Sequence, residues 1–340
     1  MNYLVAALDW GLGHTTRILP LIKELCNNHH QVIIGASPGQ ETIYEEYFPQ
    51  LSVIALPSIS PKLSAGKQQI TAICKFLPRF FQGNRRDRLL VKKAIKIYDI
   101  HCILSDNRYG FRNKKVYSIL VTHQLNVLLP KQLKFFQPLV QFFIRCYINQ
   151  FNECRVPDNE PPRNLSGILS LPLPKLKCKV VFIGSLSRLQ LSECDNKQIN
   201  YPEILFLISG PETQRSRFEH IILSELKKLP AHNTYLLVRG LPNATGNNMK
   251  NSLNHADGQT LKALIINAKY IICRSGYSTI MDLYCLGRTA MLVPTPGQPE
   301  QEYLAVYLQS KGLFCTMEQN VFSLPDALYR LENFNRTAVP

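Results

Sequence analysis

Short apolar runs bounded by turn residues alternate along the chain with longer segments whose apolar residues recur at helical spacing. This alternation is typical of strand–helix–strand units and a parallel sheet. In the first half the predicted strands are Tyr3–Leu8, Val32–Ala36, Ser52–Leu56, Cys102–Ser105 and Ser118–Thr122. The predicted helices are Thr15–Cys26 and the segments 67–96 and 131–150. Residues 1–155 are therefore predicted to form one doubly wound, Rossmann-like domain.

A second series of strands and helices follows residues 156–178, a polar, proline-rich stretch that we interpret as a linker. The predicted strands of this series are Val180–Ile183, Glu203–Ile208, Thr234–Val238, Tyr270–Cys273 and Ala290–Val293. The predicted helices are Arg215–Lys228, Gln259–Asn267, Thr279–Leu286 and Glu300–Lys311. We predict a second Rossmann-like domain over 179–331 and a polar tail over 332–340. The fold class is α/β, with two domains that face one another across a cleft.

Composition and charge narrow the class of protein. A chain of 340 residues with 45% hydrophobic and 19% charged residues is an ordinary globular protein, which excludes a disordered chain or a disulfide-rich miniprotein. Its 39 Lys and Arg exceed its 24 Asp and Glu, a net charge of +15. Residues 1–155 hold 20 basic and 9 acidic side chains. A field of this sign attracts nucleic acid, anionic lipid or phosphorylated ligands.

Cysteine spacing and hydropathy indicate the compartment. The ten cysteines are scattered without paired spacing, and several lie inside apolar runs, which favours buried reduced thiols and no metal site. The N-terminus lacks the basic stretch of a signal peptide and is interpreted as a buried strand. No uninterrupted apolar run reaches the roughly 18 residues of a membrane span. We expect a cytoplasmic protein.

A glycine-rich turn between the first strand and the first helix carries the first candidate residues, Gly11, Gly13 and His14. Glycines let the backbone approach a ligand and leave the helix N–H groups free for an anion or an acceptor oxygen. The turn is not a dinucleotide fingerprint, because Thr16 stands at its third glycine position. At a helix start His14 is favoured in its neutral form and can act as a base. The alternative is a capping or packed histidine.

Polar residues also follow two later strands of the first half. Asp106, Asn107 and Arg108 come after the strand at 102, and His123 comes after the strand at 118. A polar cluster at the carboxyl end of a strand can contact an acceptor, and Asp106 can serve as a base or orient His14. The alternative for Asp106 and Asn107 is an Asx-turn without chemistry.

The second half has matching features at its strand ends. Arg188 lies just past one strand, and Ser209-Gly210 forms a turn at the end of another, directly before a helix. A guanidinium with free backbone N–H groups is what a diphosphate needs. Near the strand at 270, a Ser-Gly turn opens a helix that carries Asp282, which is placed to accept both hydroxyls of a ribose. A later Pro/Gly loop supplies amides and carboxylates suited to sugar hydroxyls.

These motifs resemble those of the GT-B glycosyltransferases of the family 28-like group, which includes the peptidoglycan enzyme that adds N-acetylglucosamine to a lipid-linked muramyl acceptor. The chain is more similar to a little-characterised bacterial group of predicted glycosyltransferases that carry Gly-Leu-Gly-His, Ser-Asp-Asn-Arg-Tyr-Gly and Pro-Thr-Pro-Gly-Gln motifs, all present here. It departs from the peptidoglycan enzyme at Asp282, where that enzyme commonly has Glu, and at Gln301-Glu302, where it has paired glutamines.

The resemblance implies transfer of a hexosyl or N-acetylhexosaminyl group from a nucleoside-diphosphate sugar, with UDP favoured, to an acceptor that is lipid-linked in the resembling enzymes. It implies displacement with inversion, without metal or cofactor, and His14 and Asp106 as catalytic residues. The implied acceptor-binding residues are Gly11, Gly13, Asn107, Arg108 and His123. The implied donor-binding residues are Arg188, Ser209, Gly210, Ser275, Gly276, Ser278, Thr279, Asp282, Gln298, Glu300, Gln301 and Glu302.

A membrane surface is the second partner that the resemblance implies, because the first half faces the membrane in the lipid-linked enzymes. The basic and aromatic segment 67–96 and the apolar stretch Phe135–Ile148 suit anionic headgroups and shallow insertion. This predicts a peripheral location at the inner face of the cell membrane. The alternative is that these apolar helix faces pack in the core.

Two other functions remain open. An epimerase of GT-B fold acting on UDP-N-acetylglucosamine would use the same donor half, but it needs several acids at the anomeric carbon, and the first half offers chiefly Asp9 and Asp106. A basic nucleic-acid-binding protein is motivated by the net charge, but no RNP, zinc or helix-turn-helix motif accompanies that charge. We therefore expect no specific nucleic acid as a partner.

Overall fold

The computed structural model divides the chain into two compact units, Met1–Leu186 and Ser187–Pro340. It describes residues 1–58, 69–173, 175–191, 201–228, 230, 234–242, 244, 246 and 249–335, with the backbone alone over 69–77. The start of the basic segment 67–96, Cys194, residue 174 of the predicted linker and the end of the predicted tail lie outside the described residues.

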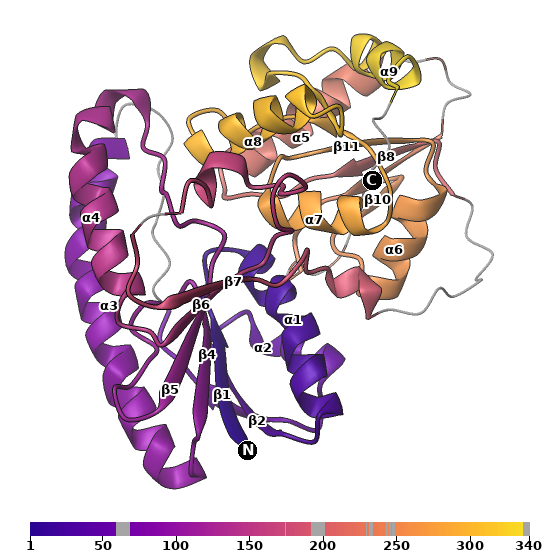
Figure 1. Cartoon of the computed structure of the whole chain (residues 1–340). Helices are drawn as coiled ribbons and strands as arrows, with labels where there is room; N and C mark the ends of the chain where they lie inside the picture. Colours follow the sequence, from indigo (N-terminus) through magenta and orange to yellow (C-terminus); the bar gives the residue numbers. More distant parts are fainter. Residues whose placement is uncertain are drawn as a thin grey trace. The chain divides into compact units, whose positions relative to one another are not determined.

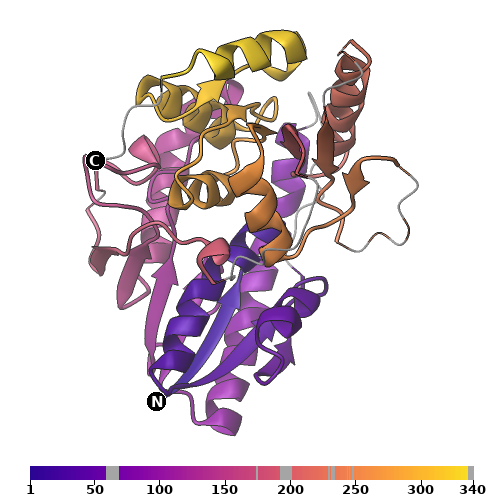
Figure 2. The same cartoon turned by 90° about the vertical axis from the view of Figure 1, so that its right-hand side faces the viewer.

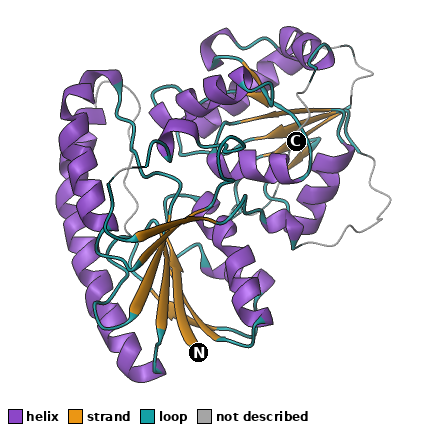
Figure 3. Cartoon of the chain, in the orientation of Figure 1, coloured by secondary structure: helices purple, strands orange, loops and turns teal. Residues whose placement is uncertain are grey.

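The first unit is a parallel sheet with helices on both faces, as Figure 3 shows. Its strand order is β3-β2-β1-β4-β5-β6-β7. The strands are β1 (Asn2–Ala7), β2 (Gln31–Ala36), β3 (Ser52–Ala55), β4 (Cys102–Asp106), β5 (Tyr117–Val121), β6 (Glu153–Val156) and β7 (Lys179–Phe182). The helices are α1 (Leu12–Asn27), α2 (Glu41–Tyr47), α3 (Gln69–Tyr98) and α4 (Gln137–Ile148), and short 3₁₀ turns are η1 (Lys131–Phe136) and η2 (Gly167–Leu169).

Burial of apolar side chains on both faces explains why these strands are continuous apolar runs. Leu4 and Ile103 pack on one face against Val91 of α3, and all three are fully buried. Helix α1 lies along β1 and β2 on the other face, where Ile18 and Ile22 are fully buried. Figures 1 and 2 show β1 leading directly into α1, both in indigo. The glycine-rich turn is thereby placed at the carboxyl edge of the sheet.

The boundary between the units differs from the predicted one. The strand predicted over Val180–Ile183 is β7, and it pairs in parallel with β6 at the edge of the first sheet instead of starting the second. Strand β6 pairs in turn with β5. The proline-rich stretch 156–178 is therefore a crossover within the first unit, which extends to Leu186.

The second unit is a six-stranded parallel sheet in the order β10-β9-β8-β11-β12-β13. Its strands are β8 (Ile204–Leu207), β9 (Tyr235–Val238), β10 (Ser252–Leu253), β11 (Tyr270–Cys273), β12 (Met291–Leu292) and β13 (Cys315–Thr316). Its helices are α5 (Gln214–Leu226), α6 (Gly258–Asn267), α7 (Tyr277–Cys285), α8 (Pro299–Ser310) and α9 (Leu324–Glu332), with 3₁₀ turns η3 (Arg188–Gln190) and η4 (Gln319–Val321).

The core of the second unit forms where β8, β9, β11 and β12 meet α5 and α9. Phe206, Phe218, Ile272 and Leu324 are fully buried there, and the rings of Phe218 and Phe322 meet edge to face at 5.7 Å. The predicted strands and helices of this half are present, whereas the sequence pattern missed α9 and the two-residue strands β10 and β13. The Ser-Gly turns predicted to bind the donor follow β8 and β11 at the carboxyl edge.

Candidate active site

In the first unit the carboxyl ends of three adjacent strands place three predicted residues side by side. The turn after β1 carries His14, β4 ends at Asp106, and His123 follows β5 by two residues. Gly11 has a φ of +93°, a left-handed backbone conformation that an L side chain rarely adopts, so glycine is required where the chain turns into α1. Gly13 lies in the first turn of α1, and its carbonyl accepts from the Thr16 hydroxyl at 3.2 Å.

His14 and Asp106 are in direct contact. The Nδ1 atom of His14 lies 2.8 Å from Oδ1 of Asp106, while the His14 side chain keeps 19% of its surface exposed and Asp106 is fully buried. A carboxylate on one ring nitrogen of a partly exposed histidine is the arrangement of a general base with its orienting acid. The structure thus brings together the two residues that the sequence assigned to catalysis, and the Asp106 side chain forms long-range contacts instead of an Asx-turn.

A third side chain, which the sequence reasoning missed, completes this cluster. Arg17 lies one turn beyond His14 on α1 and is 2% exposed. Its Nε and Nη2 atoms donate to the two oxygens of Asp106 at 2.9 and 2.5 Å. Its Nη1 and Nη2 atoms lie 2.8 Å from Nδ1 of His123 and 2.9 Å from Nδ1 of His14. The spacing of three residues puts His14 and Arg17 on one helix face, and this was the signal available in the sequence.

The charges of this cluster keep Asp106 ionised. Burial by itself raises the pKa of Asp106, but the positive charge of Arg17, together with His14 and the hydrogen bonds from both, outweighs it and lowers the pKa to about 2. Asp106 therefore holds its negative charge at neutral pH. It can orient His14 and stabilise a protonated imidazole.

The residues next to Asp106 are less available to a ligand than the sequence suggested. Arg108 is 1% exposed, and its guanidinium donates to both oxygens of Asp87, the Ser37 hydroxyl and the Pro57 carbonyl. Its charge thus ties α3 to the loops after β2 and β3 and is not presented to an acceptor. Asn107 is 7% exposed with a φ of +52°, and its Oδ1 is buried without a partner among the described residues.

Breaking the Asp87–Arg108 pair is expected to lower the stability of the first unit strongly. In an Asp87→Ala variant the Arg108 charge stays buried without its carboxylate, which costs about 3–5 kcal/mol of unfolding free energy. Urea unfolding measures this loss, with Glu45→Ala, a change at an exposed acid on α2, as the control. A loss below about 1 kcal/mol, typical of a surface ion pair, would contradict a structural role for Arg108.

In the second unit Asp282 lies beside the start of η3, next to its cap Ser187 and to Arg188. The Ser187 hydroxyl donates to Oδ1 of Asp282 at 2.5 Å, and Ser187 also accepts from the backbone N–H of Leu189 at 3.2 Å, so it caps η3. Burial raises the pKa of Asp282 to about 6, and the Arg188 charge and the Ser187 hydrogen bond offset only part of that rise. Nε of Arg188 is buried without a partner among the described residues. The structure thus brings Arg188 and Asp282 together from distant parts of the chain.

Polar atoms without partners also gather at the carboxyl edge of the second sheet. Gly210, with a φ of +111°, lies beside Thr295, and a Cβ at this position would stand at an ordinary contact distance of 3.9 Å from the Thr295 hydroxyl oxygen. That oxygen, Nε of Arg274 and Oε1 of Gln214 are buried without partners among the described residues. Arg274 also donates to the backbone carbonyl of Gln214 at 3.1 Å. Nε of Arg274 and the Thr295 hydroxyl can donate to a ligand rich in oxygen, such as a diphosphate, whereas Oε1 of Gln214 can only accept.

Arg274 is the second charge that the sequence reasoning did not assign. It is fully buried, stacks on the Phe218 ring at 4.1 Å, and donates to Oε1 of Gln319 at 2.6 Å. Burial lowers its pKa to about 10. The described residues provide no carboxylate within ion-pair distance, so Arg274 contributes an unneutralised positive charge directly before the Ser-Gly turn.

The loop before α8 is held by its own side chains. Oε1 of Gln301 accepts from the backbone N–H of Thr295 at 3.0 Å, and Oε1 of Glu302 accepts from that of Gly297 at 2.8 Å. The Ser275 hydroxyl donates to the Gln301 carbonyl at 2.8 Å. These three predicted donor residues therefore shape the loop. The other predicted residues here lie partly buried at the starts of α7 and α8, namely Gly276, Ser278, Thr279, Gln298 and Glu300.

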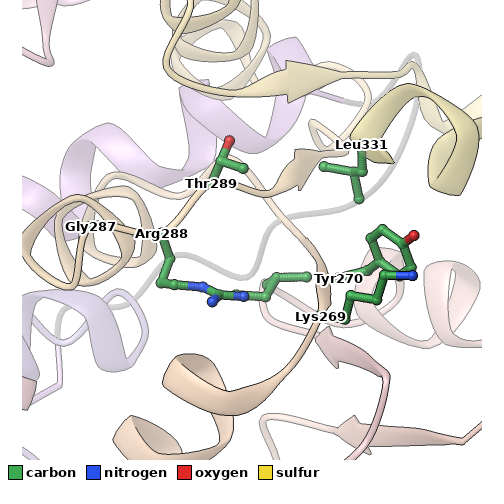
Figure 4. Close-up of a pocket in the computed structure, with 7 residues that line it drawn as sticks. Lys269, Tyr270, Gly287, Arg288, Thr289 and Leu331 are labelled. Carbon is green, nitrogen blue, oxygen red and sulfur yellow. The ribbon is translucent and has the colours of Figure 1, made fainter. Parts of the chain in front are cut away.

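A pocket at the opposite edge of this sheet does not belong to the site. Figure 4 shows Lys269, Arg288 and Leu331 around it. Apart from Leu331 of α9, its residues lie just before or at the start of β11 and just before β12, whereas the predicted donor residues follow these strands. Arg288 donates from Nη1 to the Ile266 carbonyl at 3.1 Å and from Nη2 to the Ala268 carbonyl. Its guanidinium thus caps the C-terminal end of α6, a structural role.

Comparison with known proteins relates the chain to glycosyltransferases. Residues 205–338 match the family model of the glycosyltransferase family 28 C-terminal domain. An uncharacterised glycosyltransferase of Methanosarcina acetivorans is 23% identical over 327 residues, which cover 92% of this chain and 84% of that protein.

Solved structures show the same fold over nearly the whole chain. UGT89C1 of Arabidopsis thaliana, complexed with UDP-L-rhamnose, is 12% identical with a TM-score of 0.62, covering 98% of this chain and 89% of that one. MurG of Acinetobacter baumannii is 14% identical with a TM-score of 0.54, covering 98% and 91%. The predicted GT-B fold and the family 28 likeness of the C-terminal domain are thereby confirmed. Together these similarities show a glycosyltransferase of the GT-B type.

Proposed function

We propose that this glycosyltransferase moves a hexosyl or N-acetylhexosaminyl group from a UDP-sugar, held by the second unit, to a hydroxyl of a lipid-linked acceptor held by the first. The observation that carries the chemistry is the 2.8 Å contact between Nδ1 of His14 and Oδ1 of Asp106. It supplies a base whose ring is held in place at the carboxyl edge where an acceptor binds.

The transfer is a single displacement. With its Nδ1–H donating to Asp106, His14 keeps the lone pair on Nε2 and takes the proton from the acceptor hydroxyl. The hydroxyl oxygen bonds to the anomeric carbon as the bond from that carbon to the diphosphate oxygen breaks, and the electron pair leaves with UDP. Because Arg17 and His14 occupy both oxygens of Asp106, this carboxylate is not free to act as a nucleophile, and inversion follows.

The second unit supplies the donor contacts in this proposal. Asp282 accepts the ribose hydroxyls, while Arg188 and the Ser-Gly turns at 209 and 275 hold the diphosphate. The start of α7 aims backbone N–H groups at the departing phosphate, where the helix dipole favours negative charge. The positive charge of the buried Arg274, which lies directly before the Ser-Gly turn at 275, adds to the positive potential at the start of α7. Such a positive, N–H-rich surface stabilises the leaving diphosphate and needs no metal to do so.

Donor affinity is expected to fall as the pH falls through about 6. Asp282, with a pKa of about 6, loses its charge and one acceptor site on protonation, so its hydrogen bonds to the ribose weaken below that pH. Calorimetry with UDP-glucose between pH 5 and 8 measures the effect, because the diphosphate diester does not titrate in this range. The Asp282→Asn variant should bind weakly at every pH. Wild-type affinity that stays constant down to pH 5 would contradict the ribose contact.

The acceptor part of the proposal rests on an exposed apolar surface of the first unit. Phe135 is 89% exposed and Phe142 61% exposed, and Phe136, Leu139 and Phe143 are each about half exposed. All five belong to η1 and the first two turns of α4. Soluble surfaces rarely expose contiguous apolar area of this kind, and it suits shallow insertion into a bilayer.

Positive charge on the neighbouring helix α3 favours an anionic bilayer. Helix α3 packs beside α4 through Phe80 and Tyr147, whose rings lie 5.7 Å apart, and Figure 1 shows the two helices side by side. The exposed basic residues of α3 are Arg79, Arg85, Arg86, Arg88, Lys92, Lys93 and Lys96. Only some apolar residues of α3 are available to a bilayer: Leu89 is exposed, whereas Val91 and Ala94 pack in the core. No helix among the described residues is long and apolar enough to cross a membrane.

Removal of these rings is expected to release the protein from vesicles. A Phe135→Ser, Phe142→Ser double variant should lose at least about tenfold in affinity for phosphatidylglycerol vesicles, because each buried Phe contributes about 1.5–3 kcal/mol. Co-sedimentation measures the affinity, and Val306→Ser, at an exposed apolar residue of the second unit, is the control. Equal binding to phosphatidylglycerol and phosphatidylcholine, unchanged in the double variant, would contradict the membrane surface.

A further inference from the structure

We propose that Arg17 is a positioning residue that decides which ring nitrogens of His14 and His123 carry protons. This inference rests on the proposed role of His14 as the base. Arg17 contacts His14, His123 and Asp106 together, through four hydrogen-bonding distances of 2.5 to 2.9 Å. The two hydrogen bonds from Arg17 to the oxygens of Asp106, called here the Arg17–Asp106 fork, hold the guanidinium in place. The remaining N–H donors of Arg17 therefore have fixed directions.

His123 is the simpler case. A guanidinium has donors and no acceptor, so Nδ1 of His123, 2.8 Å from Nη1 of Arg17, must be the accepting, unprotonated nitrogen. A neutral imidazole that accepts on Nδ1 carries its proton on Nε2. His123, 2% exposed at the carboxyl end of β5, is thereby fixed as a donor through Nε2. In the proposed reaction it therefore cannot compete with His14 for a proton.

His14 has two alternative states because its Nδ1 lies 2.8 Å from Oδ1 of Asp106 and 2.9 Å from Nη2 of Arg17. One ring nitrogen cannot donate to the carboxylate and accept from the guanidinium at once. Donation to Asp106 leaves the Nε2 lone pair for the acceptor proton. Acceptance from Arg17 puts the proton on Nε2 and blocks the base. The strength of the Arg17–Asp106 fork therefore sets how much of His14 is in the active tautomer.

Proton transfer to His14 changes the charges at the same contact. Once His14 has gained a proton, two cations face each other across 2.9 Å, and only the single charge of Asp106 lies between them. Tyr44 and Tyr109, two other titratable groups near Asp106, stay neutral because burial raises the pKa of each far above the physiological range. Transfer of the proton therefore places a second positive charge directly beside Arg17.

The first test uses the unaltered protein. Long-range ¹H–¹⁵N spectra of the ¹⁵N-histidine-labelled chain at pH 7.5 distinguish protonated from unprotonated ring nitrogens. We expect His123 with an unprotonated Nδ1 and a protonated Nε2, and His14 as a neutral ring with its proton on Nδ1. Assignments come from the His14→Gln and His123→Gln variants. A His123 ring protonated on Nδ1 would overturn the inference, and so would a doubly protonated His14.

The second test separates positioning from a purely structural role. Arg17→Gln removes the charge, so the acidic limb of the kcat/KM profile should move to higher pH by about one unit, a tenfold change in proton affinity. Arg17→Lys keeps the positive charge but not the two hydrogen bonds to Asp106. The acidic limb of its profile should therefore stay near that of the wild type, while kcat falls and KM for the donor is unchanged. A structural role alone would leave the limb in place in both variants. The histidine spectra do not depend on turnover, so they separate failure of this inference from failure of the proposed function.

Discussion

Substitution of His14 by Gln is expected to lower kcat about 100- to 10,000-fold, the usual contribution of a positioned general base. Gln keeps a polar side chain of similar length but cannot take the acceptor proton. The affinity for UDP-sugar should stay within about twofold of the wild type, because the proposed donor contacts all come from the second unit. Release of UDP in the presence of the acceptor measures kcat, and calorimetry measures the donor affinity.

A matched control for this variant is His220→Gln, which changes an exposed histidine on α5. It should leave kcat and affinity unchanged. A His14→Gln protein that is folded and retains more than a third of the wild-type kcat would contradict the role of His14 as the base. A loss of donor affinity equal to the loss of kcat would place His14 in donor binding instead.

The Asp282→Ala variant is expected to weaken UDP-sugar binding by about 10- to 100-fold, because hydrogen bonds to a charged group contribute about 1.5–3 kcal/mol each. Folding should not suffer in parallel. Because the pKa of Asp282 in the folded protein is raised to about 6, the ionised carboxylate destabilises the folded state at pH 7, and stability falls as the pH rises towards 6. Loss of UDP-sugar binding without loss of folding stability would thus show that Asp282 serves ligand binding and not folding.

Asp326→Ala is the matched control, since Asp326 is an exposed acid at the start of α9. It should bind UDP-sugar as the wild type does. Calorimetry gives the affinities, and thermal unfolding at pH 5 and pH 7.5 gives the stabilities. Donor affinity within threefold of the wild type in Asp282→Ala would contradict the assignment of Asp282 to the ribose.

The sequence pattern was sufficient for the central strands, such as β4, β8 and β11, because their apolar runs are buried on both faces, which leaves little ambiguity about their type. The pattern could not predict which sheet Val180–Ile183 joins, since an edge strand has the same sequence pattern in either sheet. Strand β6 was missed because it is four residues long and includes Glu153 and Arg155, which form an ion pair at 2.7 Å. Pairing partners, and hence domain boundaries, are set by contacts far apart in the sequence.

The candidate site could be predicted in part because parallel strands bring their carboxyl ends to one edge. From the sequence alone, this rule places His14, Asp106 and His123 at the same edge of the sheet. Arg17 and Arg108 could not be sorted in the same way, since the sequence does not tell whether an arginine points to solvent or into a buried ion pair. Arg17 belongs to the cluster because it lies one helical turn from His14 and hydrogen-bonds to Asp106. Arg108 instead forms an ion pair with the buried carboxylate of Asp87.

Calorimetry of the wild-type protein against a panel of nucleotide sugars tests the central claim most directly. UDP-glucose, UDP-N-acetylglucosamine, UDP-rhamnose, GDP-mannose and dTDP-rhamnose share the diphosphate but differ in base and sugar. The account predicts saturable binding of at least one UDP-sugar, weakened about 10- to 100-fold in Asp282→Ala and unchanged in Asp326→Ala. Failure of every member of the panel to bind the wild type, or binding that is the same in Asp282→Ala, would contradict it.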